Sequence, residues 1–151
     1  MKFKFPLQKV LDHRKIKEDL AQKDFQEALM VLTDLKNKLQ EMETSIHDAH
    51  LRMGLLQKQG GAQGPALTQI NDFIKNQKIL IQRQIVKIQQ QDKVVEDKRE
   101  LLRQAAIETK IIAKFKEKKF DEYKHERESE EQKEMDEQSI LRFKHIEKRG
   151  S

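Results

Sequence analysis

The sequence predicts an all-α protein: a long two-helix antiparallel coiled-coil hairpin with unequal arms. Its 151 residues are 38% charged and 36% apolar, a balance typical of a rod that buries only a narrow stripe. Apolar residues recur at alternating steps of three and four residues over two long segments, which is the period of a coiled-coil seam. Between the segments, chain-breaking residues gather at Gly60, Gly61, Gly64 and Pro65. We therefore expect a single coiled-coil domain over residues 1–151.

The first helix is expected over about residues 6–59. Pro6 suits its first turn, where the missing N–H would have no helical partner in any case. The seam of this helix is apolar at every step: Phe25, Ala28, Leu32, Leu35, Leu39, Met42, Ile46, Ala49, Met53 and Leu56. Towards the N-terminus, the same spacing reaches both charged and apolar residues: Ala21, Glu18, Arg14, Leu11 and Leu7. Nearby apolar residues there predict a shift of phase or a wider apolar face: Val10, Ile16 and Leu20.

The break between the helices is expected at about residues 60–64. Gly60 can take the left-handed conformation that ends a helix, and Gly64 and Pro65 suit the N-cap and first turn of the next. A connection this short favours antiparallel neighbours. The glycine-rich segment is therefore interpreted as the tip of a hairpin. It lacks the Gly-Lys-Ser/Thr ending of a phosphate-binding loop.

The second helix is expected over about residues 65–148, with two seam rows of different character. One row is aliphatic: Leu67, Ile74, Ile81, Ile88, Val95 and Leu102. The other is largely polar: Ile70, Gln77, Gln84, Gln91, Lys98, Ala105 and Ile112. Folding about the tip sets Val95 opposite Ala28, Ile88 opposite Leu35 and Ile81 opposite Met42. The glutamines are expected to lay their stems along the seam with their heads in water, lowering stability but fixing register.

The last third of this second helix is expected to overhang, because the first helix is shorter. It holds the polar run "KHERESEEQKEMDEQ", whose charges alternate as in a solvated single helix. Beyond that run, Ile140, Leu141 and Phe143 have no expected partner within the hairpin. Exposed apolar residues on a rod usually indicate a binding partner, so we expect a C-terminal contact there.

Several functional classes are disfavoured. The chain has no Cys, and His47 and His50 lack a third ligand, so we expect no metal and no cofactor. No constellation of catalytic residues is evident, and we expect the protein not to be an enzyme. The net charge is +5, but 31 basic residues are interleaved with 26 acidic ones, which disfavours nucleic acid as a partner. No segment resembles a signal peptide or a membrane span, so we expect a cytoplasmic protein without direct membrane insertion.

The opening "FKFPLQKVLDHRKIKEDLAQKDFQEA" and the later "EEQKEMDEQSILRF" resemble the start and the closing segment of the FliJ family of flagellar export proteins. The resemblance implies a soluble, non-enzymatic part of the flagellar type III export apparatus, similar to the central stalk of rotary ATPases. It implies binding to the hexameric export ATPase, whose ring assembly such proteins promote. It also implies contact with the export gate membrane protein and with export chaperones, at the cytoplasmic face of the flagellar base.

The resemblance also implies where partners bind. The ATPase surface would lie in the free-end part of the hairpin, away from the tip, and would be built from residues near Phe3, Phe5, Leu7, Leu11, Phe115 and Phe120. The export gate contact would lie nearer the tip, at Phe73 and Leu80. For these two residues, the alternative is that they widen the intramolecular apolar stripe. Three other functions remain open: a stalk protein of an injectisome-type system or rotary ATPase, a self-assembling structural coiled coil, and a nucleic-acid-binding rod.

Overall fold

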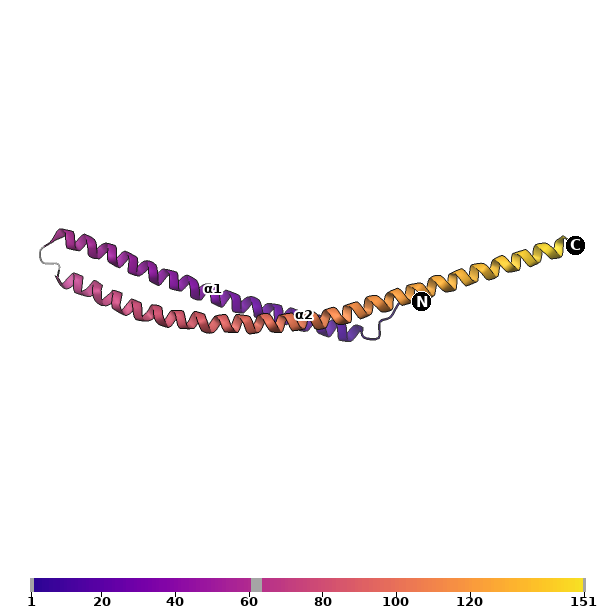
Figure 1. Ribbon diagram of the computed structural model, residues 1–151, viewed down its shortest axis with the longest axis horizontal. Coiled ribbons are helices and arrows are strands. Elements are labelled where there is room, and N and C mark those ends of the chain that lie inside the picture. Colours follow the sequence, from indigo (N-terminus) through magenta and orange to yellow (C-terminus); the bar gives the residue numbers. More distant parts are fainter. Residues whose placement is uncertain (1, 61–63, 151) are drawn as a thin grey trace. The chain divides into compact units, whose positions relative to one another are not determined.

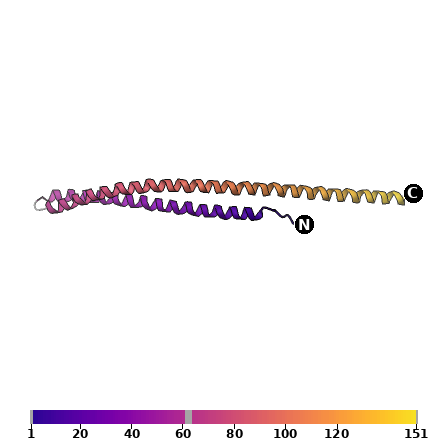
Figure 2. The same cartoon turned by 90° about the horizontal axis from the view of Figure 1, so that it is seen from below.

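The computed structural model describes residues 2–60 and 64–150, and within them the chain forms two α-helices and no strand. Helix α1 is Gln8–Gln59, with 52 residues, and helix α2 is Gly64–Arg149, with 86 residues. The first part of α2 lies alongside α1, as both views show (Figure 1 and Figure 2). The predicted all-α helical hairpin is confirmed.

The contacts divide the chain into two compact units. The hairpin unit is Asp19–Gln104, and the terminal unit combines Met1–Glu18 with Ala105–Ser151. Each unit therefore pairs a segment of α1 with a segment of α2.

The ends of the helices follow from local backbone chemistry. Gly60 directly follows α1 with a φ of 62°, the left-handed conformation expected of a glycine that ends a helix. Gly64 begins α2, and its carbonyl accepts a hydrogen bond from the Thr68 hydroxyl at 3.0 Å. The remaining predicted tip residues, 61–63, lie outside the described part of the chain. At the other end, Pro6 lies in a turn ahead of α1, and the N–H of Gln8 donates to the carbonyl of Phe5 at 3.1 Å.

The core of the hairpin unit is a narrow aliphatic seam. Ala28, Leu32 and Val95 form a buried cluster against which three partly buried residues pack: Phe25, Leu29 and Ile88. The predicted opposition of Val95 and Ala28 is thus confirmed. Nearer the tip, Ala49 and Ile74 are also buried. The three-and-four spacing of the sequence places these side chains on the facing sides of the two helices.

Two glutamines of the polar seam row point their amides across the seam rather than into water. Gln84 is only 2% exposed, and its amide donates to the carbonyl of Leu35 at 2.9 Å. The amide of Gln91 likewise donates to the carbonyl of Ala28 at 3.0 Å. The expectation that these heads reach water was wrong, because a helical carbonyl keeps a second lone pair that a side chain across the seam can use.

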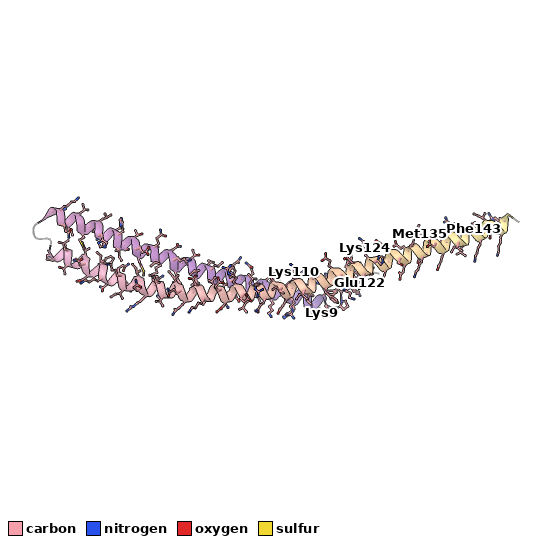
Figure 3. All side chains as sticks on the ribbon, in the orientation of Figure 1. Lys9, Lys110, Glu122, Lys124, Met135 and Phe143 are labelled. Atoms are coloured by element: carbon pink, nitrogen blue, oxygen red, sulfur yellow. The ribbon has the colours of Figure 1, made fainter. Side chains whose placement is uncertain are left out.

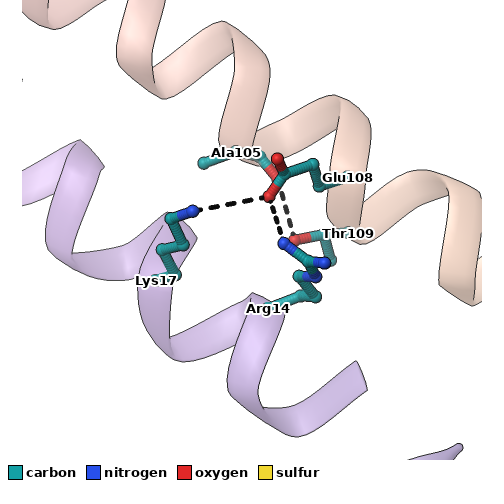
Figure 4. A network of polar contacts seen from close by, with 5 residues as sticks. All are labelled: Arg14, Lys17, Ala105, Glu108 and Thr109. Atoms are coloured by element: carbon teal, nitrogen blue, oxygen red, sulfur yellow. Dashed lines mark hydrogen bonds and ion pairs between the residues drawn. The ribbon is translucent and has the colours of Figure 1, made fainter. Parts of the chain in front are cut away.

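The terminal unit continues the same seam spacing with different chemistry. Leu11 is 2% exposed, and Ala105 and Thr109 are buried opposite the start of α1. Arg14 forms an ion pair with Glu108 at 2.6 Å, and Lys17 approaches the same carboxylate oxygen at 3.7 Å (Figure 4). The mixed seam is therefore completed by a charge pair.

The expected shift of phase or wider apolar face in α1 was wrong. Val10, Ile16 and Leu20 are exposed, whereas Leu11, Arg14 and Glu18 hold the less exposed positions that continue the seam. The burial of Leu11 continues the seam in the same phase, and Glu108 on α2 gives Arg14 a partner at its seam position.

Candidate interaction surfaces

An aromatic cluster fixes the non-helical N-terminal residues onto α2 within the terminal unit. The Phe3 ring lies 5.4 Å from that of Phe120 at an interplanar angle of 73°, and 5.5 Å from that of Tyr123. The Phe5 ring lies 5.8 Å from that of Phe115. Such pairs contribute about 0.5–1.5 kcal/mol each beyond the area they bury. The structure thus brings together Phe3, Phe5, Phe115 and Phe120, four of the six residues assigned to the ATPase surface from the sequence.

Only part of that predicted ATPase surface faces outward. Leu7, Phe115 and Phe120 are between 37% and 45% exposed. Phe5 and Leu11 are buried, so their side chains are not open to a partner. A shallow hollow of about 430 Å³ lies beside Phe3 and Phe120, lined also by Ala113, Lys116 and Glu117. Tyr123, a ring partner of Phe3, was missed from the sequence, although it follows Phe120 by three residues, the spacing of one helical face.

Several lysines neighbour these rings in the sequence. The stretch "IAKFKEKKF", residues 112–120, interleaves four lysines with two phenylalanines. The non-helical residues 2–7, which we call the N-terminal lead, add Lys2 and Lys4. The Lys119 ammonium lies 5.5 Å from the centre of the Phe115 ring and 3.3 Å from a carboxylate oxygen of Glu122. A surface of exposed rings among cations suits a partner that presents carboxylates beside apolar side chains.

In the hairpin unit, Phe73 and Leu80 each line a hollow to which both helices contribute. The hollow at Phe73 has a volume of about 310 Å³ and is lined also by Ala49, Arg52, Gln69 and Ile70. The hollow at Leu80 has a volume of about 470 Å³ and is lined also by Lys38, Glu41, Met42, Ser45, Gln77, Arg83, Gln84 and Lys87. Phe73 and Leu80 are 45% and 42% exposed. Both therefore offer apolar surface to a partner beside the seam.

The third predicted contact, in the last part of α2, is fully solvent-facing. Every described residue from Lys124 to Gly150 is exposed, and Ile140, Leu141 and Phe143 are between 55% and 66% exposed. Figure 3 labels Phe143 and the equally exposed Met135 in this segment. The surface is open: Ile140 and Leu141 lie between an acidic stretch, 126–137, and a basic one, 142–149, and Phe143 lies within the basic stretch.

One exposed ion pair on α2 has a perturbed carboxyl. Arg103 donates hydrogen bonds to both carboxylate oxygens of Glu100, at 2.6 and 2.9 Å, and this lowers the pKa of Glu100. The two residues are three apart on one helix, where such pairs commonly stabilise the helix locally. Within the described residues no group of three or more His, Cys, Asp or Glu side chains is placed to hold a metal ion. None of the described helical segments has the length and apolar character of a membrane span.

Comparison with known proteins gives one informative match. The family model described as "Flagellar FliJ protein" matches residues 3–148. No curated protein sequence matches the chain significantly. A similar solved structure is that of a protein from Chlamydia trachomatis described as a possible YscO homolog, with 23% sequence identity, 93% of each chain covered and a TM-score of 0.43. The family match spans nearly the whole sequence.

Proposed function

The chain belongs to the FliJ family, a family of coiled-coil proteins associated with type III export, and we propose that it acts there as a non-enzymatic stalk. The stalk binds the hexameric flagellar export ATPase, promotes assembly and activity of the ATPase ring, and couples the ring to the export gate and to export chaperones. It works in the cytoplasm, peripherally at the base of the flagellum.

The observation that best supports an ATPase contact is the packing of the N-terminal lead onto α2 in the terminal unit. Three ring–ring contacts hold Phe3 and Phe5 on α2, so the outward rings of Phe115 and Phe120 stand on a pre-organised base. A surface whose side chains are already ordered loses less conformational entropy on binding. The lysines around the rings add attraction for an acidic rim and raise the rate of encounter.

The other two contacts follow the exposed apolar side chains. Phe73 and Leu80 of the hairpin unit bind the export gate, through the hollows that they line. Ile140, Leu141 and Phe143 form the C-terminal contact. Export chaperones are bound as additional partners, and nucleic acid is not.

The test is the activity of the purified flagellar export ATPase with and without this protein, alongside light scattering of each component. We expect stimulation with ATPase oligomers, from a protein that does not self-assemble. Phe115→Ala with Phe120→Ala should reduce the stimulation at least about tenfold, because two exposed anchor rings are lost. Leu55→Ala, at an exposed apolar position of the hairpin unit, is the matched control and should leave the stimulation unchanged.

The same assay separates the alternatives. Stimulation of an injectisome-type or rotary ATPase in place of the flagellar one would reassign the partner. A stable rod of several copies without any stimulation would favour a structural coiled coil and sink the stalk proposal.

A further inference from the structure

A row of exposed side chains repeats every seven residues along α2 in the hairpin unit. The row is Phe73, Leu80, Lys87, Val94 and Leu101, and its four apolar members are between 40% and 53% exposed. A matching row on α1 runs Arg52, Ser45, Lys38 and Val31. Phe73 lines one hollow together with Arg52, and Leu80 and Lys87 line the other together with Ser45 and Lys38. The two rows therefore form the two sides of one groove, which we call the flank groove.

The flank groove continues beyond the two hollows by the register of the coil. Val31 is seven residues before Lys38, and Val94 is seven residues after Lys87, so each lies one heptad further from the tip on its own row. Leu101 extends the α2 row by one more heptad. On its α2 side the groove is thus apolar at both ends, and its middle is cationic on both helices.

The seven-residue spacing indicates the shape of the occupant. A row with this spacing keeps a constant position beside a left-handed coiled-coil seam, so it can be followed continuously only by another α-helix. This row is not part of the seam between α1 and α2, because Ile74 and Val95 are the buried seam residues of α2. An exposed apolar row beside a complete seam is typical of a site for a further helix.

The opposite flank of the hairpin unit shows that the row is not a general feature of the coil. Its residues are mainly polar: Gln22, Lys36, Glu43 and His50 on α1, and Asn71, Lys78, Asp92 and Arg99 on α2. Its two apolar residues, Leu29 and Ile85, are partly buried. Arg99 lies over the Phe25 ring at 5.2 Å, which covers part of the seam from that side. Of these two described flanks, only the flank groove is left open to a third helix.

Charge indicates the chemistry of that helix. Lys38, Arg83 and Lys87 line the middle hollow with Glu41 as the single carboxylate. Among the described residues, none of these three cations forms an ion pair. Facing lysines repel each other and attract a carboxylate placed between them.

We propose that the flank groove docks an acidic amphipathic α-helix of a partner protein as a third strand of the hairpin unit. Apolar side chains of that helix pack on Phe73 and Leu80 towards the tip and on Val31, Val94 and Leu101 away from it. A carboxylate between the two apolar patches faces Lys38 and Lys87. The inference rests on the proposed function in that Phe73 and Leu80 are the export gate contact, and it names the kind of element that this surface takes.

A second copy of this chain is a poor occupant. Two copies meeting through the same groove would bring like charges together, because an isologous contact places the same patch on both sides. The acidic stretch of the chain, residues 126–137, has Met135 as its single apolar residue, so it cannot fill an apolar row of several heptads.

The test uses the full chain and a synthetic, fluorescently labelled four-heptad peptide with leucine at two positions of each heptad and glutamate at the flanking ones. We expect saturable binding by fluorescence anisotropy, with gain of peptide helicity by circular dichroism. Lys38→Glu with Lys87→Glu should weaken binding at least about tenfold, since attraction becomes repulsion. Lys36→Glu with Lys78→Glu makes the same charge change on the opposite flank and should alter binding less than twofold. Leu101→Asn should weaken binding without loss of protein helicity, because the residue is 53% exposed.

Equal effects of the two charge reversals, or no peptide binding, would overturn the inference. So would self-association of the chain that Leu101→Asn abolishes, because a second copy would then fill the groove. The proposed function is judged separately, with the cytoplasmic part of the export gate protein as the probe. If that probe binds and Phe73→Ala weakens it while the Lys38/Lys87 reversal and Leu101→Asn do not, the gate contact stands and the acidic-helix inference falls.

Discussion

The hairpin unit and the terminal unit join the same two helices by different chemistry. In the hairpin unit, Ala28, Leu32 and Val95 form an aliphatic core, and glutamine amides cross the seam to backbone carbonyls. In the terminal unit, a non-helical lead is held by aromatic rings, and Arg14 meets Glu108. An aliphatic seam can form again after a slip of one whole heptad, whereas ring contacts and ion pairs depend on the placement of particular residues. The difference suits a unit that offers a long groove and a unit that presents a defined end.

The largest effect on this comparison is expected from truncating one buried leucine in each unit. Leu11→Ala in the terminal unit and Leu32→Ala in the hairpin unit should each lower the free energy of unfolding by about 3 kcal/mol, because a buried methyl-rich side chain leaves a cavity. Hydrogen exchange measured by mass spectrometry should lose protection around residues 8–18 for Leu11→Ala and around residues 25–56 for Leu32→Ala. Loss of protection along the whole chain in both variants would mean that the two units unfold as one.

A smaller effect, of opposite sign, is expected at the glutamine of the hairpin seam. Gln84→Leu replaces a buried amide with an apolar side chain and should raise the free energy of unfolding by about 1 kcal/mol, since polar seam residues lower stability. The Leu35 carbonyl loses one hydrogen bond and keeps its place in the helix. Urea unfolding followed by circular dichroism measures the change.

The same substitution should weaken the choice of register. The double variant Gln84→Leu with Gln91→Leu is expected to form larger species by light scattering, while the partly matched Gln77→Leu, nearer the tip, changes the size less. A loss of stability in the Gln84 variant would show that the amide–carbonyl bond outweighs the burial of the polar group, and would make the two units more alike than we argue.

The repeating part of the fold could be predicted from the sequence. Individual side-chain contacts between the two helices could not. The seam from Phe25 onward and the left-handed Gly60 follow from spacing and residue type alone. The Arg14–Glu108 pair joins residues 94 apart, so no local pattern contains it. The destination of the Gln84 amide was misjudged because periodicity places a side chain on the seam without saying which backbone atom it reaches.

The candidate surfaces were predictable to the same degree. Phenylalanines stand out in so polar a sequence, so Phe73, Phe115 and Phe120 were chosen as candidates, and all three are exposed. Their binding to a partner stays a prediction. That Lys38 and Lys87 line one hollow required the register between the helices, which a single residue of slip would change.

The smallest change in the free energy of unfolding is expected at the Arg14–Glu108 ion pair of the terminal unit. Arg14→Met and Glu108→Gln should each lower the free energy of unfolding by about 0.5–1 kcal/mol, because the pair is short, at 2.6 Å, but its side chains are 36% and 40% exposed. A double-mutant cycle from urea unfolding gives the coupling between the two residues. The coupling should shrink towards zero in about 1 M NaCl, where the Debye length is about 3 Å. Lys17→Met, which removes the longer 3.7 Å contact to Glu108, is the internal control and should couple less. If the Arg14–Glu108 coupling were insensitive to salt and larger than the gain from Gln84→Leu, the terminal unit would owe its register to this pair, and the aromatic lead would be secondary.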